Sequence, residues 1–182
     1  MARQSGIIKL KGTIGDITFY KSKDGYLARQ KGGVDKERFH NDPKFQRTRE
    51  NAAEFARAGK ASKALCSAIR PVLIKTQDLR MISRLVKSMM QVIKADQVRN
   101  RGLRNVLDGE LILLQGFDFN GNARLSATVY APYTTTIGRA TGILEVNVAS
   151  FFPNSQIVAP GGTTHFRLIS AGVEVDFENL DW

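Results

Sequence analysis

Cysteine, histidine and tryptophan are almost missing from this sequence. Its 182 residues include one cysteine, Cys66, two histidines, His40 and His165, and one tryptophan. A single cysteine excludes a disulfide within the chain and fits a reducing compartment. A structural zinc site needs several converging cysteine or histidine ligands, and so few are present that such a site is nearly excluded. We therefore expect neither a metal nor a cofactor.

Long apolar runs are also missing. No stretch of about 18 apolar residues occurs, so no transmembrane helix and no membrane insertion are expected. The opening residues, Met1–Gln4, do not lead into the apolar run of a signal peptide. The expected location is the cytoplasm of the cell that makes the protein, or a virion if the gene comes from a phage.

The motifs of common enzymes are not found. The sequence has no G-x-S-x-G, no P-loop, and no G-x-G-x-x-G before a helix. Cys66 lies in a run of small residues with no neighbouring base to activate it. His165 alternates with Phe166 and is expected to face solvent or a partner. We therefore expect a protein that is not an enzyme and has no catalytic residue.

Charge is abundant and very unevenly distributed. Residues 1–107 carry 24 basic against 9 acidic side chains, a net charge of +15, whereas residues 108–182 carry 3 against 8, a net charge of −5. Such a polarised chain can attract a polyanion with one end, and copies of it can attract one another head to tail. The charge pattern favours a binding or assembling protein.

Residues 1–41 are expected to form an N-terminal β-hairpin arm. Asp24-Gly25 lies between two β-prone segments, Ile17–Tyr20 and Tyr26–Arg29, and such a dipeptide is a strong hairpin signal. A bulge is expected near Gly15. A hairpin alone is marginally stable in water, so it must pack on its own chain or on another subunit.

Residues 42–107 are expected to be helical and basic. Asp42 followed by Pro43 is typical of a helix N-terminus, and Pro71 predicts a break after Arg70. A stripe with helical spacing, large at its ends and small in the middle, consists of Phe45, Thr48, Ala52, Phe55, Gly59, Ser62, Cys66 and Ile69. A second helix is expected over 77–99, antiparallel to the first.

Residues 108–182 are expected to form a small antiparallel β-sandwich. Strands are predicted over 111–114, 117–119, 125–129, 144–148, 166–168 and 173–177, with a hairpin turn at Asn120-Gly121. Glu174, Asp176 and Glu178 would share an exposed strand face and, with Asp181, form an acidic strip. The complete prediction is an α+β fold in three parts: β-hairpin, basic antiparallel helical hairpin and β-sandwich.

Five short stretches together resemble an uncharacterised family of small cytoplasmic proteins from Bacteroidota. These stretches are Gly12–Tyr20, Arg47–Asn51, Ala131–Tyr133, Arg139–Gly142 and Thr163–Arg167. The resemblance spans most of the chain. Because the family has no assigned activity, it implies no role for any residue.

Two functions remain open from the sequence. The first is a structural subunit that assembles with copies of itself into a ring, tube, filament or phage-like particle. Its predicted contacts are Ile17, Phe19, Tyr20 and Tyr26 for strand addition, and Glu174, Asp176 and Glu178 for pairing with basic faces of a neighbour. The alternative is a protein that binds nucleic acid or another polyanion without reading bases. Its phosphate contacts would be Arg57, Lys60, Lys63, Arg80, Arg84, Lys87, Arg101 and Arg104.

Overall fold

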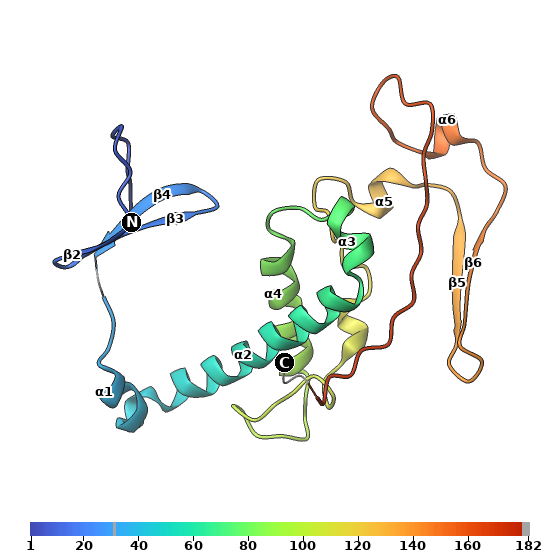
Figure 1. The fold of residues 1–182 in the computed structure, drawn as a ribbon. Helices are drawn as coiled ribbons and strands as arrows, with labels where there is room; N and C mark the ends of the chain where they lie inside the picture. The colour runs from blue at the N-terminus through green and yellow to red at the C-terminus, as the bar shows by residue number, and fades with distance from the viewer. Residues whose placement is uncertain (31, 180–182) are drawn as a thin grey trace. The chain divides into compact units, whose positions relative to one another are not determined.

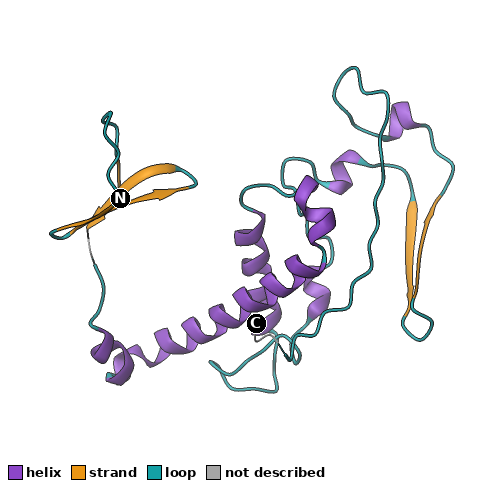
Figure 2. Cartoon of the chain, in the orientation of Figure 1, coloured by secondary structure: helices purple, strands orange, loops and turns teal. Residues whose placement is uncertain are grey.

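The computed structural model describes residues 1–30 and 32–179, and the chain divides into two compact units, 1–49 and 50–182. Helices and strands are both present, so the expected α+β class is confirmed (Figures 1 and 2). Most of the predicted helical region, 50–107, shares the second unit with the predicted C-terminal domain, whereas residues 42–49 belong to the first unit. Among the described helices, none combines the length and the apolarity that crossing a bilayer requires.

The first unit contains a four-stranded antiparallel sheet with the order β1-β4-β3-β2. Its strands are β1 (Ala2–Arg3), β2 (Gly12–Ile14), β3 (Ile17–Ser22) and β4 (Gly25–Gln30). The predicted hairpin is the β3–β4 pair, closed where Ser22 pairs with Gly25.

The bulge expected near Gly15 is a turn in the structure. Ile14 of β2 pairs with Ile17 of β3, so Gly15 and Asp16 form a two-residue hairpin connection. Gly15 has a φ of 55°, which a glycine adopts without steric cost and which suits this tight connection.

Asp42 caps a helix, as the sequence predicts, but a short helix already precedes it within the segment expected as the hairpin arm. After α1 (Lys36–Asn41), the Asp42 carboxylate accepts a hydrogen bond of 2.9 Å from the amide of Lys44 and caps the short helix η1 (Pro43–Phe45). The long helix α2 (Gln46–Ala68) follows directly. It ends just before α3 (Arg70–Thr76), whose first turn contains Pro71, at the predicted break.

The second long helix, α4 (Met81–Lys94), is shorter than the predicted span of 77–99 but packs as expected. Ala58 and Ala61 of α2 lie in one buried cluster with Ile93 near the end of α4. Met81, at the beginning of α4, packs with Cys66 near the end of α2. This order of contacts is antiparallel, and small side chains on α2 let the larger ones of α4 fit against it.

The predicted sandwich is only partly present. One antiparallel pair forms from β5 (Tyr133–Gly138) and β6 (Ile143–Val148), and β6 matches the predicted strand over 144–148. The remaining elements are short helices: η2 (Leu111–Leu114), α5 (Leu125–Thr128) and α6 (Pro153–Gln156). Among the described residues, no second sheet forms after residue 107, and neither 166–168 nor 173–177 is a strand.

Packing on the helices explains this correction. Leu114 of η2, Phe117 and Phe119 lie against the helical core, so the segment expected as strands covers α4 instead. The expected turn glycine, Gly121, donates its amide to the Asp78 carboxylate at 2.7 Å, just before α4. The apolar residues here are therefore buried by helices, and a periodic pattern cannot distinguish this from burial in a sheet.

Two glycines provide a test of this packing. A Cβ on Gly109 would overlap the carbonyl oxygen of Val92 and lie 2.9 Å from its carbonyl carbon, both in the backbone of α4. Gly59 lies inside α2 with no atom within 4 Å of the added Cβ. We expect Gly109→Ala to lower the free energy of unfolding by about 2 kcal/mol and Gly59→Ala to raise it by about 0.5 kcal/mol.

Urea unfolding followed by circular dichroism measures both changes. Gly59→Ala is the matched control, because it adds the same methyl group to the same unit. An unchanged urea midpoint for Gly109→Ala would contradict the close approach of residue 109 to α4.

Candidate functional site

One face of the N-terminal sheet is largely apolar. Ile14 pairs with Ile17, Gly12 with Phe19 and Lys21 with Tyr26, which places Ile14, Ile17, Phe19 and Tyr26 on the same face as Lys21, whose Nζ lies 5.6 Å from the centroid of the Tyr26 ring. Ile14 is 65% exposed and Ile17 is 47% exposed. The structure therefore brings together three of the four hairpin residues predicted for assembly and adds Ile14 to them.

Tyr20 lies on the opposite face of the sheet. It neighbours Phe19 in β3, and successive side chains of a strand point to opposite faces. The guanidinium of Arg29 lies 5.5 Å from its ring centroid, and its hydroxyl donates to the sulfur of Met1 at 2.9 Å. Tyr20 is thus used in contacts within the sheet and does not join the apolar face.

The first unit has no buried residue among those described. Every residue of 1–30 and 32–49 is exposed or half-buried. A sheet of three or more strands becomes stable when an apolar face is covered. The face that contains Ile14 and Ile17 is therefore the surface of this unit that most needs a partner. The two edge strands, β1 and β2, are short, which disfavours the addition of a further strand.

The β5–β6 hairpin has a second apolar face. Tyr133 pairs with Val148, Thr135 with Val146 and Ile137 with Leu144, so these six side chains share one side, whereas the other side carries Thr134, Thr136, Glu145 and Asn147. Ile137 is 68% exposed and Tyr133 is 48% exposed. The chain thus presents two separate β-surfaces with apolar residues on one side.

The centre of the second unit is a buried ion pair. Glu54 of α2 has no exposed surface, and its carboxylate accepts hydrogen bonds from Nε and Nη2 of Arg104 at 2.7 and 2.9 Å. The same carboxylate accepts the amide of Gly102 at 2.8 Å. Nη1 of Arg57 donates to the carbonyls of Gly102 and Arg104 at 2.7 and 3.1 Å. We call Glu54, Arg57 and Arg104 the polar clamp.

Asp96 holds the same loop from the side of α4. One carboxylate oxygen accepts the amides of Val98 and Arg99, at 2.8 and 3.0 Å, and the other accepts the amide of Asn105 at 3.1 Å. These bonds turn the chain just after Ala95 and end α4 there. The loop over 96–105 is thus held to both long helices, and no described buried side-chain nitrogen or oxygen lacks a partner.

The hydrogen bonds of the loop also set the pKa values of its carboxyl groups. Burial raises the pKa of Glu54, but the hydrogen bonds from Arg104 and Gly102 outweigh burial and leave the pKa below its ordinary value. The same balance lowers the pKa of Asp96, through the amides of Arg99, Asn105 and Val98. Both groups are therefore charged at neutral pH, and they act as hydrogen-bond acceptors that hold the loop.

Four of the eight predicted phosphate contacts, all arginines, donate side-chain hydrogen bonds to other residues of the second unit. Arg57 and Arg104 belong to the polar clamp. Nη2 of Arg101 donates to Asn51 at 2.8 Å. Arg84 pairs with Asp78 and donates to the carbonyl of Asp118 at 2.7 Å. These guanidinium groups hold loops of the second unit in place, and no observation tests the nucleic-acid prediction.

The predicted cations are divided among several small hollows. Arg57 and Lys60 line a pocket of 290 Å³ with Arg99, whereas Arg84 and Lys87 line another of 440 Å³. Lys63 is exposed on α2, and Arg80 directly precedes α4. Among the described hollows, none brings together the eight cations predicted to bind nucleic acid.

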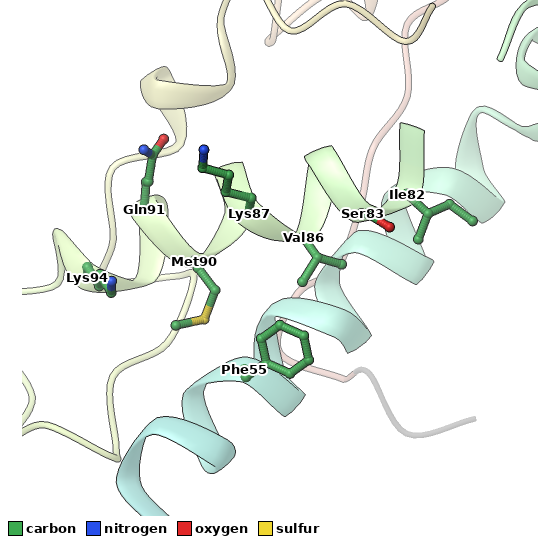
Figure 3. A pocket seen from close by; sticks show the side chains of 8 residues that line it. All are labelled: Phe55, Ile82, Ser83, Val86, Lys87, Met90, Gln91 and Lys94. Atoms are coloured by element: carbon green, nitrogen blue, oxygen red, sulfur yellow. The ribbon is translucent and has the colours of Figure 1, made fainter. Parts of the chain in front are cut away.

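A groove of 480 Å³ runs along α4 beside α2 (Figure 3). Phe55, Ile82, Val86 and Met90 supply its apolar lining. Lys87, Lys94, Ser83 and Gln91 supply the polar part of the lining. Phe55 is 60% exposed although the sequence places it in the buried stripe. This groove is a third apolar surface of the chain.

The predicted acidic strip is not a strand face. The Asp176 carboxylate accepts the amides of Glu178 and Asn179 at 2.8 and 3.2 Å and the side-chain amide of Asn179 at 2.8 Å. These bonds, first among them the one from the Asn179 side chain, lower the pKa of Asp176. They form a turn, so Glu174, Asp176 and Glu178 do not alternate as in a strand. Asp181 lies outside the described residues.

The sequence does not predict that two carboxylates of the second unit, Glu54 and Asp96, are buried. Glu54 is the buried partner of a residue fifty positions away, and its only signal is helical spacing to Ala58, Ala61 and Ser62. Asp96 has the signal of an aspartate just after a periodic helix. Neither residue type in isolation indicates whether it will be buried.

Comparison of the chain with protein-family models, with curated proteins and with solved structures finds no match. The resemblance to a Bacteroidota family therefore stays a prediction. The functional argument rests on the surfaces described above.

A double-mutant cycle tests the polar clamp. Glu54→Gln leaves Arg104 without its anionic partner, and we expect the free energy of unfolding to fall by about 3 kcal/mol. Arg104→Gln should have a similar cost. The double variant can form an amide–amide hydrogen bond, so its loss should be smaller than the sum of the single losses by about 1 kcal/mol or more. Additive losses in urea unfolding would show that the two residues are not coupled.

The lowered pKa of Glu54 predicts a dependence of stability on pH. Because the folded carboxyl binds a proton less readily than the unfolded one, its contribution is present above about pH 4 and is lost as the pH falls through the lower, folded value. We expect urea midpoints of the wild type to drop between about pH 5 and pH 3. Glu54→Gln should drop less over the same range, and equal slopes would contradict the assignment.

Proposed function

We propose that this protein is a non-enzymatic structural subunit that assembles with copies of itself. The observation that carries the proposal is the apolar face of the N-terminal sheet, where Ile14 and Ile17 lie exposed in a unit without a buried residue among those described. The occupant of this face is an apolar β-surface of a second copy. The β5–β6 hairpin is a surface of this kind, and sheets pack through such faces at about 10 Å.

The two β-surfaces differ from each other, which bears on the kind of assembly. When one surface of a copy meets a different surface of the next, the contact is heterologous, and repeated contacts form rings or filaments. A contact between the sheet of one copy and the β5–β6 hairpin of the next is of this type. A ring, tube, filament or phage-like particle would fit this arrangement.

Adjacent residues of β3 supply a matched pair of variants. Ile17→Lys places a charge on the apolar face, and Thr18→Lys places the same charge on the opposite face of the same strand. We expect the wild type and Thr18→Lys to form multi-subunit species by light scattering on a sizing column. Ile17→Lys should shift the mass toward 20.2 kDa, because burying an unpaired charge disfavours the contact.

Circular dichroism checks that each variant keeps the helices of the second unit. A wild-type protein that remains at 20.2 kDa across the micromolar range would refute the proposal. Equal masses for the wild type and Ile17→Lys would show that assembly does not use this face.

A further inference from the structure

The last part of the chain is an extended arm that is docked at its two ends. Its middle touches the rest of the chain at Phe166, whose ring centroid lies 6.0 Å from that of Phe151, and at Gly172, which lies beside Leu144 of β6. We call residues 158–179 the C-terminal arm; Figure 1 draws most of it as the red trace that leaves α6. At its beginning the amide of Val158 donates to the carbonyl of Thr128 at 2.8 Å. Residues 158–174 are all exposed, and the hydrogen bonds found within this stretch are local, at the Pro160 turn and between Thr164 and His165.

The far end of the arm docks on the helices. Phe177 packs against the buried cluster that contains Ala58, Ala61 and Val106. Phe177 and Glu178 line the pocket of 290 Å³, together with Arg57, Lys60, Arg99, Asn105, Val106 and Leu107. An aromatic side chain thus packs on the apolar core, and an acidic residue lines the same hollow as three cations.

The middle of the arm has the pattern of a strand without a strand partner. Phe166, Leu168 and Val173 are between 44% and 47% exposed. His165, Arg167 and Glu174 alternate with them, as in a half-buried strand. Backbone groups in this stretch can pair with another β-segment, and apolar side chains on one side can then be covered.

We infer that the C-terminal arm is exchanged between subunits, so that Phe177 and Glu178 of one copy occupy the pocket beside Arg57, Lys60 and Arg99 of the next. Exchange keeps the docking contact unchanged, because the pocket and the arm are identical in every copy. It also lets the middle of the arm cross a neighbouring subunit and find a partner there. An extended chain spans roughly 3.3 Å per residue, so an arm of this length reaches at most about 70 Å.

This inference rests on the proposed function and names the contact that links neighbouring subunits. The arm contributes the acidic side chains Glu174, Asp176 and Glu178, and the pocket belongs to the basic part of the chain. The acidic C-terminal end of one copy then lies on the basic helices of the next, which makes the contact head to tail.

Disulfide trapping distinguishes exchange from docking within one chain. Cys66 is first replaced by serine, so that introduced cysteines are the only thiols. One chain carries Lys60→Cys and a second chain carries Glu178→Cys, at two positions that line the same pocket. The two chains are co-expressed, purified together and oxidised. We expect a covalent dimer on a non-reducing gel.

A matched control uses Glu174→Cys, which lies on the exposed part of the arm and does not line the pocket. It should give a dimer yield at least several-fold lower. A third chain carries both Lys60→Cys and Glu178→Cys. If this chain closes on itself while the mixed pair stays monomeric, the arm docks within its own chain and exchange is refuted. If no combination closes, the arm does not occupy the pocket, which also refutes exchange.

The two proposals fail in different ways. A wild type that assembles and is dissociated by Ile17→Lys, but shows only intrachain closure, keeps the structural subunit and removes arm exchange. A wild type of 20.2 kDa at all concentrations removes the structural subunit as well. Melting temperatures of each cysteine variant under reducing conditions, compared with Cys66→Ser alone, confirm that all chains are folded.

Discussion

The carboxylate of Glu54 determines how the second unit is organised. It lies without exposed surface on α2 and draws Arg104 and the amide of Gly102 onto the helix. Because a buried charge is tolerated only when it is paired and fully hydrogen-bonded, the loop must follow one path. That path carries the chain past α4 at Gly109, where a side chain would meet Val92. After this point Leu114 packs against the helical core.

Local signals in the sequence are predicted correctly, whereas the buried face of α2 is predicted only in part. Asp24-Gly25 closes a hairpin and Asp42-Pro43 begins a helix, because each depends on the conformation of a few neighbouring residues. The buried side of α2 is different. The sequence suggests a stripe through Phe55 and Gly59, whereas the buried side runs through Glu54, Ala58 and Ala61. Glu54 looks like a surface residue until its partner, far along the chain, is known. Periodicity alone therefore cannot distinguish the observed buried side of α2 from a side that is rotated by one residue.

The C-terminal part shows the same limit for strands. The alternation at Leu144, Val146 and Val148 corresponds to a real strand, since β5 lies beside it. The equally regular alternation at Phe166 and Leu168 has no strand partner among the described residues. A period of two indicates a segment that can be half-buried in a sheet, but the partner can belong to another molecule. The missing half of the predicted sandwich is consistent with strands that are paired between copies, which is the form that the proposed assembly takes.

Because all copies carry the same net charge, the proposed assembly depends on short-range contacts between them. Each copy has a net charge of +10, so copies repel one another at a distance. At physiological ionic strength this repulsion is screened beyond about 8 Å, whereas the burial of apolar side chains does not depend on screening. In the proposed assembly, the acidic end of the arm would offset part of the remaining repulsion, because Glu178 lines the same pocket as Arg57 and Arg99. Apolar faces would then supply the attraction, and the uneven charge would select the surface of the neighbour on which the arm docks.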